Sequence, residues 1–198
     1  HEPSVPWIVR SVLQKVGYNP DKYHIQCLLH RQSADIAAGV DHSLEQRRNP
    51  EEYRPALQLG AGDQGVIVGY ACSETPQMLP LPVVLAHRIT GALTAARKSG
   101  MIPALRPDGK ALVTVEYDED GKPLRLDTVV ISAQPSPEIP DDELCWELTD
   151  KVLSPALQSL PPDEDTKLLI NPSGRFVLGG PEADTGLTGR KLMVDSYG

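Results

Sequence analysis

The sequence contains few cysteines and no apolar run long enough to cross a membrane. Its three cysteines, Cys27, Cys72 and Cys145, are odd in number and scattered, which fits neither a disulfide framework nor a CxxC metal clasp. We expect reduced thiols in a cytoplasmic protein, each cysteine serving as a small buried apolar side chain. Stretches such as Leu79 to Ala86 are interrupted by proline and are far shorter than the roughly 20 residues that a bilayer requires, so no membrane partner is expected.

Positive charge is also scarce. The 198 residues carry 19 Lys and Arg against 27 Asp and Glu, a net charge of −8. A molecule with this charge repels polyanions, so nucleic acid is not an expected partner, and any phosphate site must be a local cluster of cations. The first residues have no basic segment followed by an apolar one, and no secretory signal is expected there. The length allows one large domain or two small ones.

Several catalytic signatures are missing. There is no HExxH zinc motif, no GxSxG nucleophile elbow, no Walker A sequence and no Rossmann GxGxxG. No metal ligands are therefore assigned from the sequence. The histidines at positions 24, 30, 42 and 87 are interpreted as surface or structural residues.

Hydrophobic spacing predicts an α+β protein with helices on one face of a sheet. Ser4 and Gly17 are expected to bound an amphipathic helix that packs on a core. Further helices are predicted over 81–98 and 142–153, the latter capped by aspartate. A hairpin is predicted from 111–117 and 124–132, with its turn at Asp118 to Gly121. Other predicted strands cover 25–29, 66–72, 167–170 and 176–178, and the polar stretch 41–54 is expected to form a mobile loop.

Three short segments are candidates for ligand contact, each with a simpler structural interpretation. Gly60 to Gly65 would let the backbone approach a ligand, but a tight turn is favoured for this segment alone. Arg106 to Lys110 would place a cation near phosphate, although a solvated turn is favoured there. Gly174 to Phe176 contains the only phenylalanine, for which purine stacking and core packing are about equally favoured.

The strongest local cluster runs from Gly179 to Lys191. Its glycines surround Asp184, and it ends in the adjacent cations Arg190 and Lys191. An open backbone that ends in two cations suits triphosphate binding.

Taken together, these segments resemble the S-adenosylmethionine synthetase (methionine adenosyltransferase) family. The matching segments are Gln32 to Val40, Gly60 to Gly65 with Gly69 to Ala71, Leu105 to Lys110, Asn171 to Gly180, and Asp184 to Gly198. Ala34 and Ala38 depart from the usual Pro and Gln of the family, and Gly109 replaces a bulkier residue, so gating is expected to differ.

The resemblance implies a fold of three similar α+β repeats. Residues 1–48 would be the end of the first repeat with its mobile gating loop, 59–178 the central repeat, and 179–198 the start of the last. The family's phosphate-binding His-Pro-Asp-Lys segment and its Gly- and Lys-rich segment have no counterpart here. We therefore expect an incomplete chain that is not a working enzyme alone.

The family joins the sulfur of L-methionine to C5′ of ATP and hydrolyses the released triphosphate to pyrophosphate and phosphate. A thioether is already nucleophilic, so alignment and charge stabilisation must supply the catalysis. By resemblance, the catalytic residues are Lys110, Arg190 and Lys191. The ATP-binding residues are Asp108, Lys110, Arg175, Phe176, Asp184, Arg190 and Lys191, with Phe176 stacking on adenine. The methionine-binding residues are Gln32, Asp63 and Asp184.

Mg²⁺ and K⁺ are the cations that the resemblance implies, and a homo-oligomer built as a dimer of dimers is the implied assembly. Two other functions stay open. One is a catalytically inactive nucleotide-binding or regulatory relative, and the other is a generic phosphate-binding module.

Overall fold

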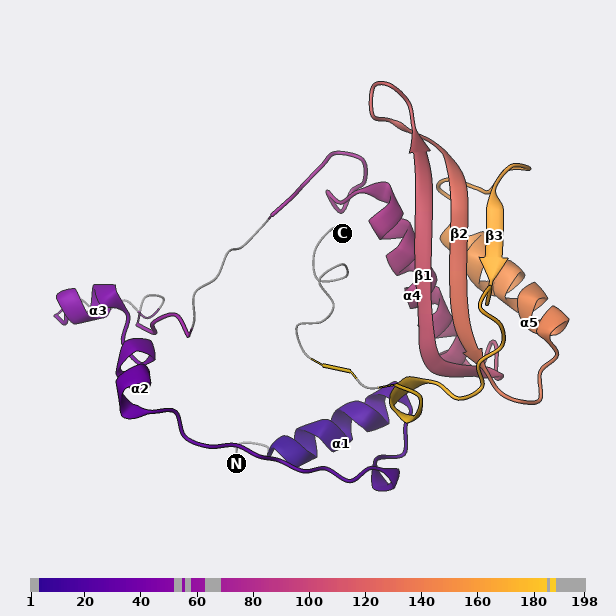
Figure 1. Cartoon of the computed structure of the whole chain (residues 1–198). Coiled ribbons are helices and arrows are strands. Elements are labelled where there is room, and N and C mark those ends of the chain that lie inside the picture. Colours follow the sequence, from indigo (N-terminus) through magenta and orange to yellow (C-terminus); the bar gives the residue numbers. More distant parts are fainter. Residues whose placement is uncertain (1–3, 52–54, 56–57, 63–68, 185, 188–198) are drawn as a thin grey trace. The chain divides into compact units, whose positions relative to one another are not determined.

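A computed structural model describes residues 4–51, 55, 58–62, 69–184 and 186–187. The chain divides into two compact units, residues 1–68 and 69–198, and each is described here by itself (Figure 1).

The first unit begins with helix α1 (Val5–Val16), which follows the N-cap Ser4 and ends at Gly17. Gly17 has φ 109°, a left-handed conformation in which glycine is favoured, so both predicted ends are confirmed. The predicted packing on a core is wrong for this chain, because no residue of α1 is buried. Trp7, for example, is 59% exposed.

Two short helices lie in this unit, and the second of them falls within the stretch 41–54 that was predicted to be loop. They are α2 (Ala34–Val40) and α3 (Leu44–Arg48), and they follow the 3-10 turn η1 (Pro20–Lys22). Each begins after a serine whose hydroxyl accepts a backbone N–H, Ser33 from Ile36 at 3.3 Å and Ser43 from Gln46 at 3.1 Å. Residues 44–48 therefore form a helix where the sequence predicted a loop, and the mobility of the stretch 41–54 stays a prediction.

The second unit contains a three-stranded sheet with the order β1-β2-β3. Strands β1 (Leu105–Tyr117) and β2 (Pro123–Pro135) are antiparallel, whereas β3 (Lys167–Ile170) runs parallel to β2. Helix α4 (Leu81–Ser99) precedes the sheet and ends at Gly100 with φ 73°. Helix α5 (Asp141–Leu148), the π-helical turn η3 (Thr149–Leu153) and α6 (Ser154–Ala156) connect β2 to β3.

The predicted hairpin is confirmed, and its strands are longer than expected. Gly121 has φ 76° in the turn, and the Asp118 carboxylate accepts the N–H of Lys122 at 2.7 Å. In β2 the buried residues Leu126 and Val129 are three apart, although a regular strand alternates every two residues. A bulge resolves the mismatch, because Thr114 pairs with Thr128 and Val115 with Leu126, leaving Asp127 without a partner in the register.

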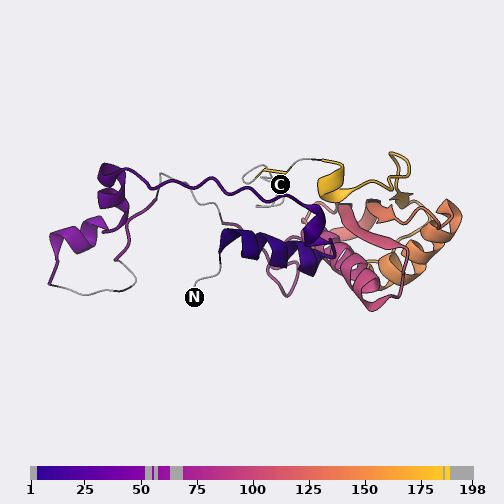
Figure 2. The same cartoon turned by 90° about the horizontal axis from the view of Figure 1, so that it is seen from below.

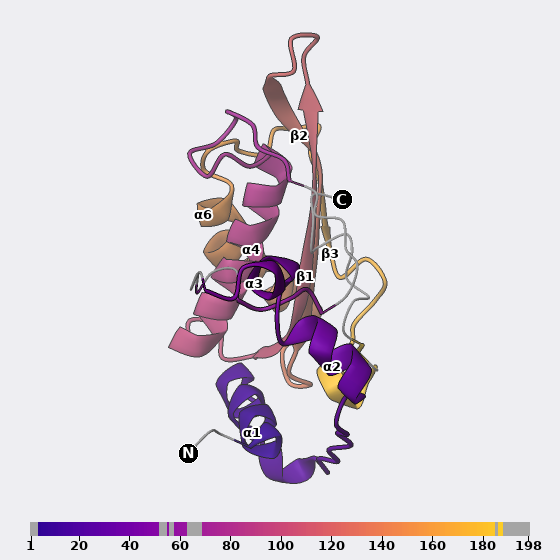
Figure 3. The same ribbon diagram turned by 90° about the vertical axis from the view of Figure 1, so that its left-hand side faces the viewer.

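The core lies between the sheet and the helices, as Figure 2 and Figure 3 show from two directions. Apolar side chains of α4, β2, α5 and η3 supply most of it, including Leu85, Ile89, Leu126, Val129, Ile131, Leu144, Leu148 and Val152. The helices lie on one side of the sheet, and the segment after β3 passes on the other side. The predicted α+β class with helices on one sheet face is thus confirmed.

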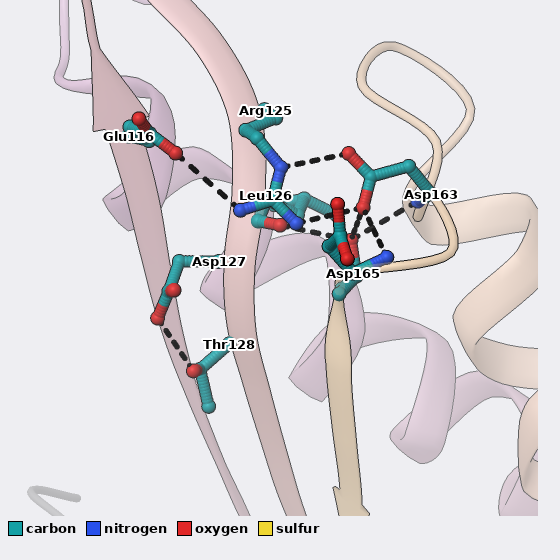
Figure 4. Close-up of polar contacts among 8 residues, drawn as sticks. Glu116, Arg125, Leu126, Asp127, Thr128, Asp163 and Asp165 are labelled. Carbon is teal, nitrogen blue, oxygen red and sulfur yellow. Dashed lines mark hydrogen bonds and ion pairs between the residues drawn. The ribbon is translucent and has the colours of Figure 1, made fainter.

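A salt bridge anchors the loop that leads into β3. The Arg125 guanidinium on β2 contacts both carboxylate oxygens of Asp163 at 2.7 Å and Glu116 at 3.4 Å (Figure 4). Arg125 and then the Thr166 hydroxyl hold the pKa of Asp163 well below its usual range. The Thr166 hydroxyl lies 2.8 Å from both the Asp163 carboxylate and the carbonyl of Leu126 on β2, so its one proton is shared between the two acceptors.

Other predicted features differ from the structure. Residues 25–29 and 176–178 form no strand, and Leu28 is 81% exposed. Residues 66–68 of a further predicted strand lie outside the described residues, and 69–72 are not a strand. The third helix begins after Pro140 without a side-chain cap, so the predicted aspartate cap is wrong.

The expected burial of the cysteines is wrong, whereas the expected surface position of the histidines is confirmed. All three cysteines are unpaired, but Cys27 is exposed and Cys72 and Cys145 are half-buried, so none is the buried side chain that we expected. The histidines at 24, 30, 42 and 87 are exposed, in agreement with the surface interpretation. Within the described ranges, no helix is both long and apolar enough to span a membrane.

Candidate functional site

The predicted site residues fall into three groups. Asp63, Arg190 and Lys191 lie outside the described residues. Gln32 is exposed in the first unit, just before α2. The remaining predicted residues all lie in the second unit and make up the candidate site there. They are Asp108, Lys110, Arg175, Phe176 and Asp184.

The segment Arg106 to Lys110 begins strand β1 and is not the solvated turn that the sequence favoured. The strand is irregular here, because Leu105 pairs with Pro135 and Gly109 with Ala133, so β1 has two more residues than β2 over this interval. A Cβ on Gly109 would meet the Leu93 side chain at 3.3 Å, so Gly109 faces α4. Successive residues of a strand face opposite sides, and the exposed Lys110 therefore faces away from the helices.

Asp108 joins this strand to the segment after β3. Its carboxylate accepts the N–H of Gly180 at 2.8 Å. Its own N–H donates to the side-chain oxygen of Gln134, a buried residue near the end of β2, at 3.3 Å. The structure thus brings together two of the segments that the sequence singled out, Arg106 to Lys110 and the glycines at 179 and 180.

Asn171 redirects the chain immediately after β3. Its backbone has φ 46°, and its N–H donates to Ile131 at 2.9 Å. The side-chain amide then bonds Ala133 twice, accepting its N–H at 2.9 Å and donating to its carbonyl at 3.1 Å. An amide side chain offers the same donor and acceptor as a peptide group, so Asn171 continues the pairing with β2 while the backbone turns away.

Arg175 is used to hold this segment in place. Its guanidinium donates to the carbonyl oxygens of Ile139 at 2.8 Å and Ser136 at 2.7 Å, and it pairs with the Asp141 carboxylate. Both carbonyls and the carboxylate belong to the turn between β2 and α5 and to the start of α5. The geometry therefore assigns Arg175 an anchoring role, whereas the resemblance implied contact with ATP.

Phe176 is half-buried, and Asp184 is exposed. The Asp184 N–H donates to the carbonyl of Gly180 at 3.2 Å, just beyond the short 3-10 helix η4 (Gly180–Glu182). Anchors on both sides of Phe176 hold the backbone that carries the ring. Half-burial leaves part of the ring accessible to a ligand.

A pocket of about 450 Å³ lies beside the Arg175 anchor, where Ser136 and Ile139 form part of its wall. Its charged lining is acidic overall, with Glu138, Glu143 and Glu147 against Arg106. A hydrogen bond from Ser136, together with the nearby Arg106, lowers the pKa of Glu138, so this carboxylate stays charged. A triphosphate would be repelled from this pocket.

Among the residues that the structure describes, no group of three or more His, Cys, Asp or Glu side chains lies together as a metal site. A Mg²⁺ ion held by one or two carboxylates and by substrate phosphates would not need such a group. No catalytic step is assigned to a metal ion here.

Sequence reasoning missed Gln134, Ser136 and Asp141. Only Gln134 carried a detectable signal, as an amide that follows the apolar run of β2. Ser136 accepts from Arg175 through its backbone carbonyl, and the two residues are 39 apart in sequence. Asp141 accepts from Arg175 through its exposed carboxylate, and these two are 34 apart. Nothing in the local sequence marks such a partner.

Two comparisons with known proteins point to the same family. Residues 58–176 match the family model described as S-adenosylmethionine synthetase, central domain. The chain is also 47% identical over 198 aligned residues to an S-adenosylmethionine synthase from Pseudothermotoga lettingae. That alignment includes 96% of this chain and 50% of the relative, so the chain spans about half the length of that protein.

Proposed function

Because the chain belongs to the S-adenosylmethionine synthetase family, we propose that the complete protein forms S-adenosylmethionine from ATP and L-methionine. It would release triphosphate and hydrolyse it to pyrophosphate and phosphate. The observation that carries this proposal is the 2.8 Å hydrogen bond between the Asp108 carboxylate and the Gly180 N–H. This bond joins the Lys110 strand to the glycine segment that leads toward Arg190 and Lys191, the two places where cations for a polyphosphate were predicted.

Residue roles follow from the same proposal. The nucleotide would be bound by Asp108, Lys110, Arg175, Phe176, Asp184, Arg190 and Lys191, and methionine by Gln32, Asp63 and Asp184. The exposed Lys110 is the described residue best suited to contact phosphate directly, since it is a cation beside the Asp108–Gly180 junction. Arg175 would act on the nucleotide through the backbone that it anchors, because its donors already bond Ser136, Ile139 and Asp141.

The chemistry asked of these side chains is electrostatic. The methionine thioether attacks C5′ of ATP, the bond from C5′ to the triphosphate oxygen breaks, and negative charge accumulates on the leaving group. A cation already in place beside the leaving group stabilises that charge without reorganising. Lys110, Arg190 and Lys191 would have this role, and no general base is needed because the sulfur carries no proton.

Mg²⁺ and K⁺ are proposed as the cations of the reaction on the basis of the family alone. Residues 1–48, 59–178 and 179–198 are proposed to belong to the first, central and last repeats of the family fold. A cytoplasmic location is proposed for the same reason.

We propose a homo-oligomer, a dimer of dimers, and exposed apolar side chains on the sheet face away from the helices support the association. Leu112, Val130 and Leu169 are in register across the three strands on the side away from the helices. Leu112 is 56% exposed and Leu169 is 41% exposed. An in-register row of exposed apolar side chains favours burial against another protein surface.

The decisive experiment measures S-adenosylmethionine formation by the full-length gene product supplied with ATP, methionine, Mg²⁺ and K⁺. Product formation is expected, and its absence would contradict the catalytic proposal. ATP binding without turnover would instead favour an inactive nucleotide-binding relative. If methionine failed to increase affinity for a non-hydrolysable ATP analogue, a generic phosphate-binding module would be favoured.

A further inference from the structure

A buried amide connects three segments that meet at the candidate site. Gln134 is 7% exposed and lies near the end of β2. Its oxygen accepts the N–H of Asp108 on β1 at 3.3 Å, and its nitrogen donates to the carbonyl of Val177, after β3, at 2.7 Å. The two partners fix which way the amide points, because one offers a donor and the other an acceptor.

Gly179 is fitted to this amide. A Cβ at Gly179 would lie 2.7 Å from the amide carbon of Gln134 and 2.9 Å from its oxygen and nitrogen. The backbone of Gly179, with φ −148° and ψ 177°, is extended and open to any residue. The requirement for glycine therefore comes from the Gln134 side chain and not from backbone strain.

The contacts of Gln134 reach two residues of the proposed nucleotide site. Asp108 is bonded to the amide by its N–H and to Gly180 by its carboxylate. Phe176 directly precedes Val177, whose carbonyl the amide binds. Moving the amide would therefore change the separation of Asp108 and Phe176.

We propose that Gln134 is a positioning residue that holds residues 176–180 at a fixed distance from Asp108, with Gly179 as its steric counterpart. The consequence for nucleotide binding rests on the proposed function. The structural part, the coupling of Gln134 to Phe176 and Gly179, does not, so the two can fail separately.

The first test is a double-mutant cycle in the full-length gene product, with the affinity for a non-hydrolysable ATP analogue as the readout. Gln134→Ala alone should weaken binding roughly three- to tenfold, the range for losing one or two hydrogen bonds. Gly179→Ala alone should weaken it at least as much, because the new methyl displaces the amide. The double variant should bind no worse than Gln134→Ala, since the clash is gone. Additive losses would overturn the steric pairing.

The second test reads the position of Phe176 without a nucleotide. Fluorophenylalanine is incorporated, and the ¹⁹F resonance of Phe176 is identified by its loss in Phe176→Leu. Gln134→Met keeps the length of the side chain and removes both hydrogen bonds, so it should shift or broaden this resonance in the folded protein. The control is Gln158→Met, the same exchange at an exposed glutamine, which should leave the resonance unchanged.

The outcomes separate the possibilities. If Gln134→Met lowers the melting temperature but changes neither the resonance nor the analogue affinity, Gln134 is an ordinary core residue and the positioning role is wrong. If the resonance shifts while the wild-type protein binds no ATP analogue, the positioning role stands and the nucleotide proposal fails. If both the resonance and the affinity change, and Gln158→Met changes neither, both parts are supported.

Discussion

At the scale of single residues, Arg175 has the side-chain type expected for phosphate but the contacts of an anchor. Two backbone carbonyls and Asp141 take up its guanidinium donors. The partners of Arg175 in the structure are therefore protein groups, and its contact with ATP stays a prediction. Such an arginine affects ligand binding through the conformation of the backbone it fixes.

Replacing Arg175 tests this distinction. Arg175→Lys keeps the charge but cannot reach several acceptors with one planar group, so it should destabilise the protein by about 1–3 kcal/mol. Asp141→Asn removes only the ion pair and should cost less. Thermal unfolding of the two variants measures the difference. Equal stability of Arg175→Lys and wild type would contradict the anchoring role.

Lys110 provides the opposite case, an exposed cation at the start of the longest strand pair. In the full-length protein, Lys110→Met should lower turnover by roughly a hundredfold while methionine binding changes little, since the charge acts on the leaving triphosphate. Arg190→Ala should have the same signature. Steady-state kinetics together with the methionine dissociation constant make the comparison.

The matched control for Lys110 is Lys122→Met, in the hairpin turn, where the side chain is 76% exposed. This variant should leave turnover unchanged. A loss of methionine binding in Lys110→Met as large as its loss of turnover would contradict a role specific to the leaving group.

At the scale of elements, the sequence predicted those parts whose signals are local. Helix α4 and the hairpin were expected because the spacing of apolar residues and the glycine that ends the helix or forms the turn lie within each segment. The bulge at Asp127 was not expected, because it depends on which face of β2 the α4 side chains cover. The supposed strand at 176–178 failed for a similar reason, since Gln134 takes up the Val177 carbonyl through a contact 43 residues apart in sequence.

The salt bridge between β2 and the loop before β3 predicts an acid-dependent contribution to stability. The pKa of Asp163 is lowered in the folded state, so its contribution is complete above the ordinary aspartate pKa of about 3.9 and is lost as the pH falls below it. Asp163→Asn should therefore be less stable than wild type at neutral pH. The difference should shrink under acid conditions.

Denaturant unfolding at several pH values measures this difference. Asp165→Asn, two residues along the same loop, is the control and should not reproduce the pH dependence. A stability gap between wild type and Asp163→Asn that stayed constant down to strongly acid pH would contradict the assignment of the effect to the Arg125 pair.

At the scale of the whole molecule, the exposed apolar row of Leu112 and Leu169 predicts how association can be broken. Leu112→Lys places a charge in the middle of the apolar row and should shift the full-length protein toward smaller species, because a buried unpaired charge is costly. Light scattering with size-exclusion chromatography gives the mass. Met101→Lys, at a residue 53% exposed in the turn after α4, is the control and should leave the mass unchanged.

An unchanged mass in Leu112→Lys would show that this face is not the contact between subunits. The test matters for catalysis because the chain spans about half of its relative, at 50% coverage. If the activity of the complete protein depends on the proposed association, Leu112→Lys should lose activity together with mass.

The parallel pairing of β3 with β2 also has a kinetic consequence. The β1–β2 hairpin closes a short loop and can form early, whereas β3 must wait until the connection through α5 and α6 has folded back. Asn171, Val177 and Gly180 all follow β3, so we expect the contacts that order the candidate site to form last on folding.

With only four residues, β3 can also detach without melting the hairpin. The site would then have a lifetime of its own, set by how often this short strand leaves the sheet.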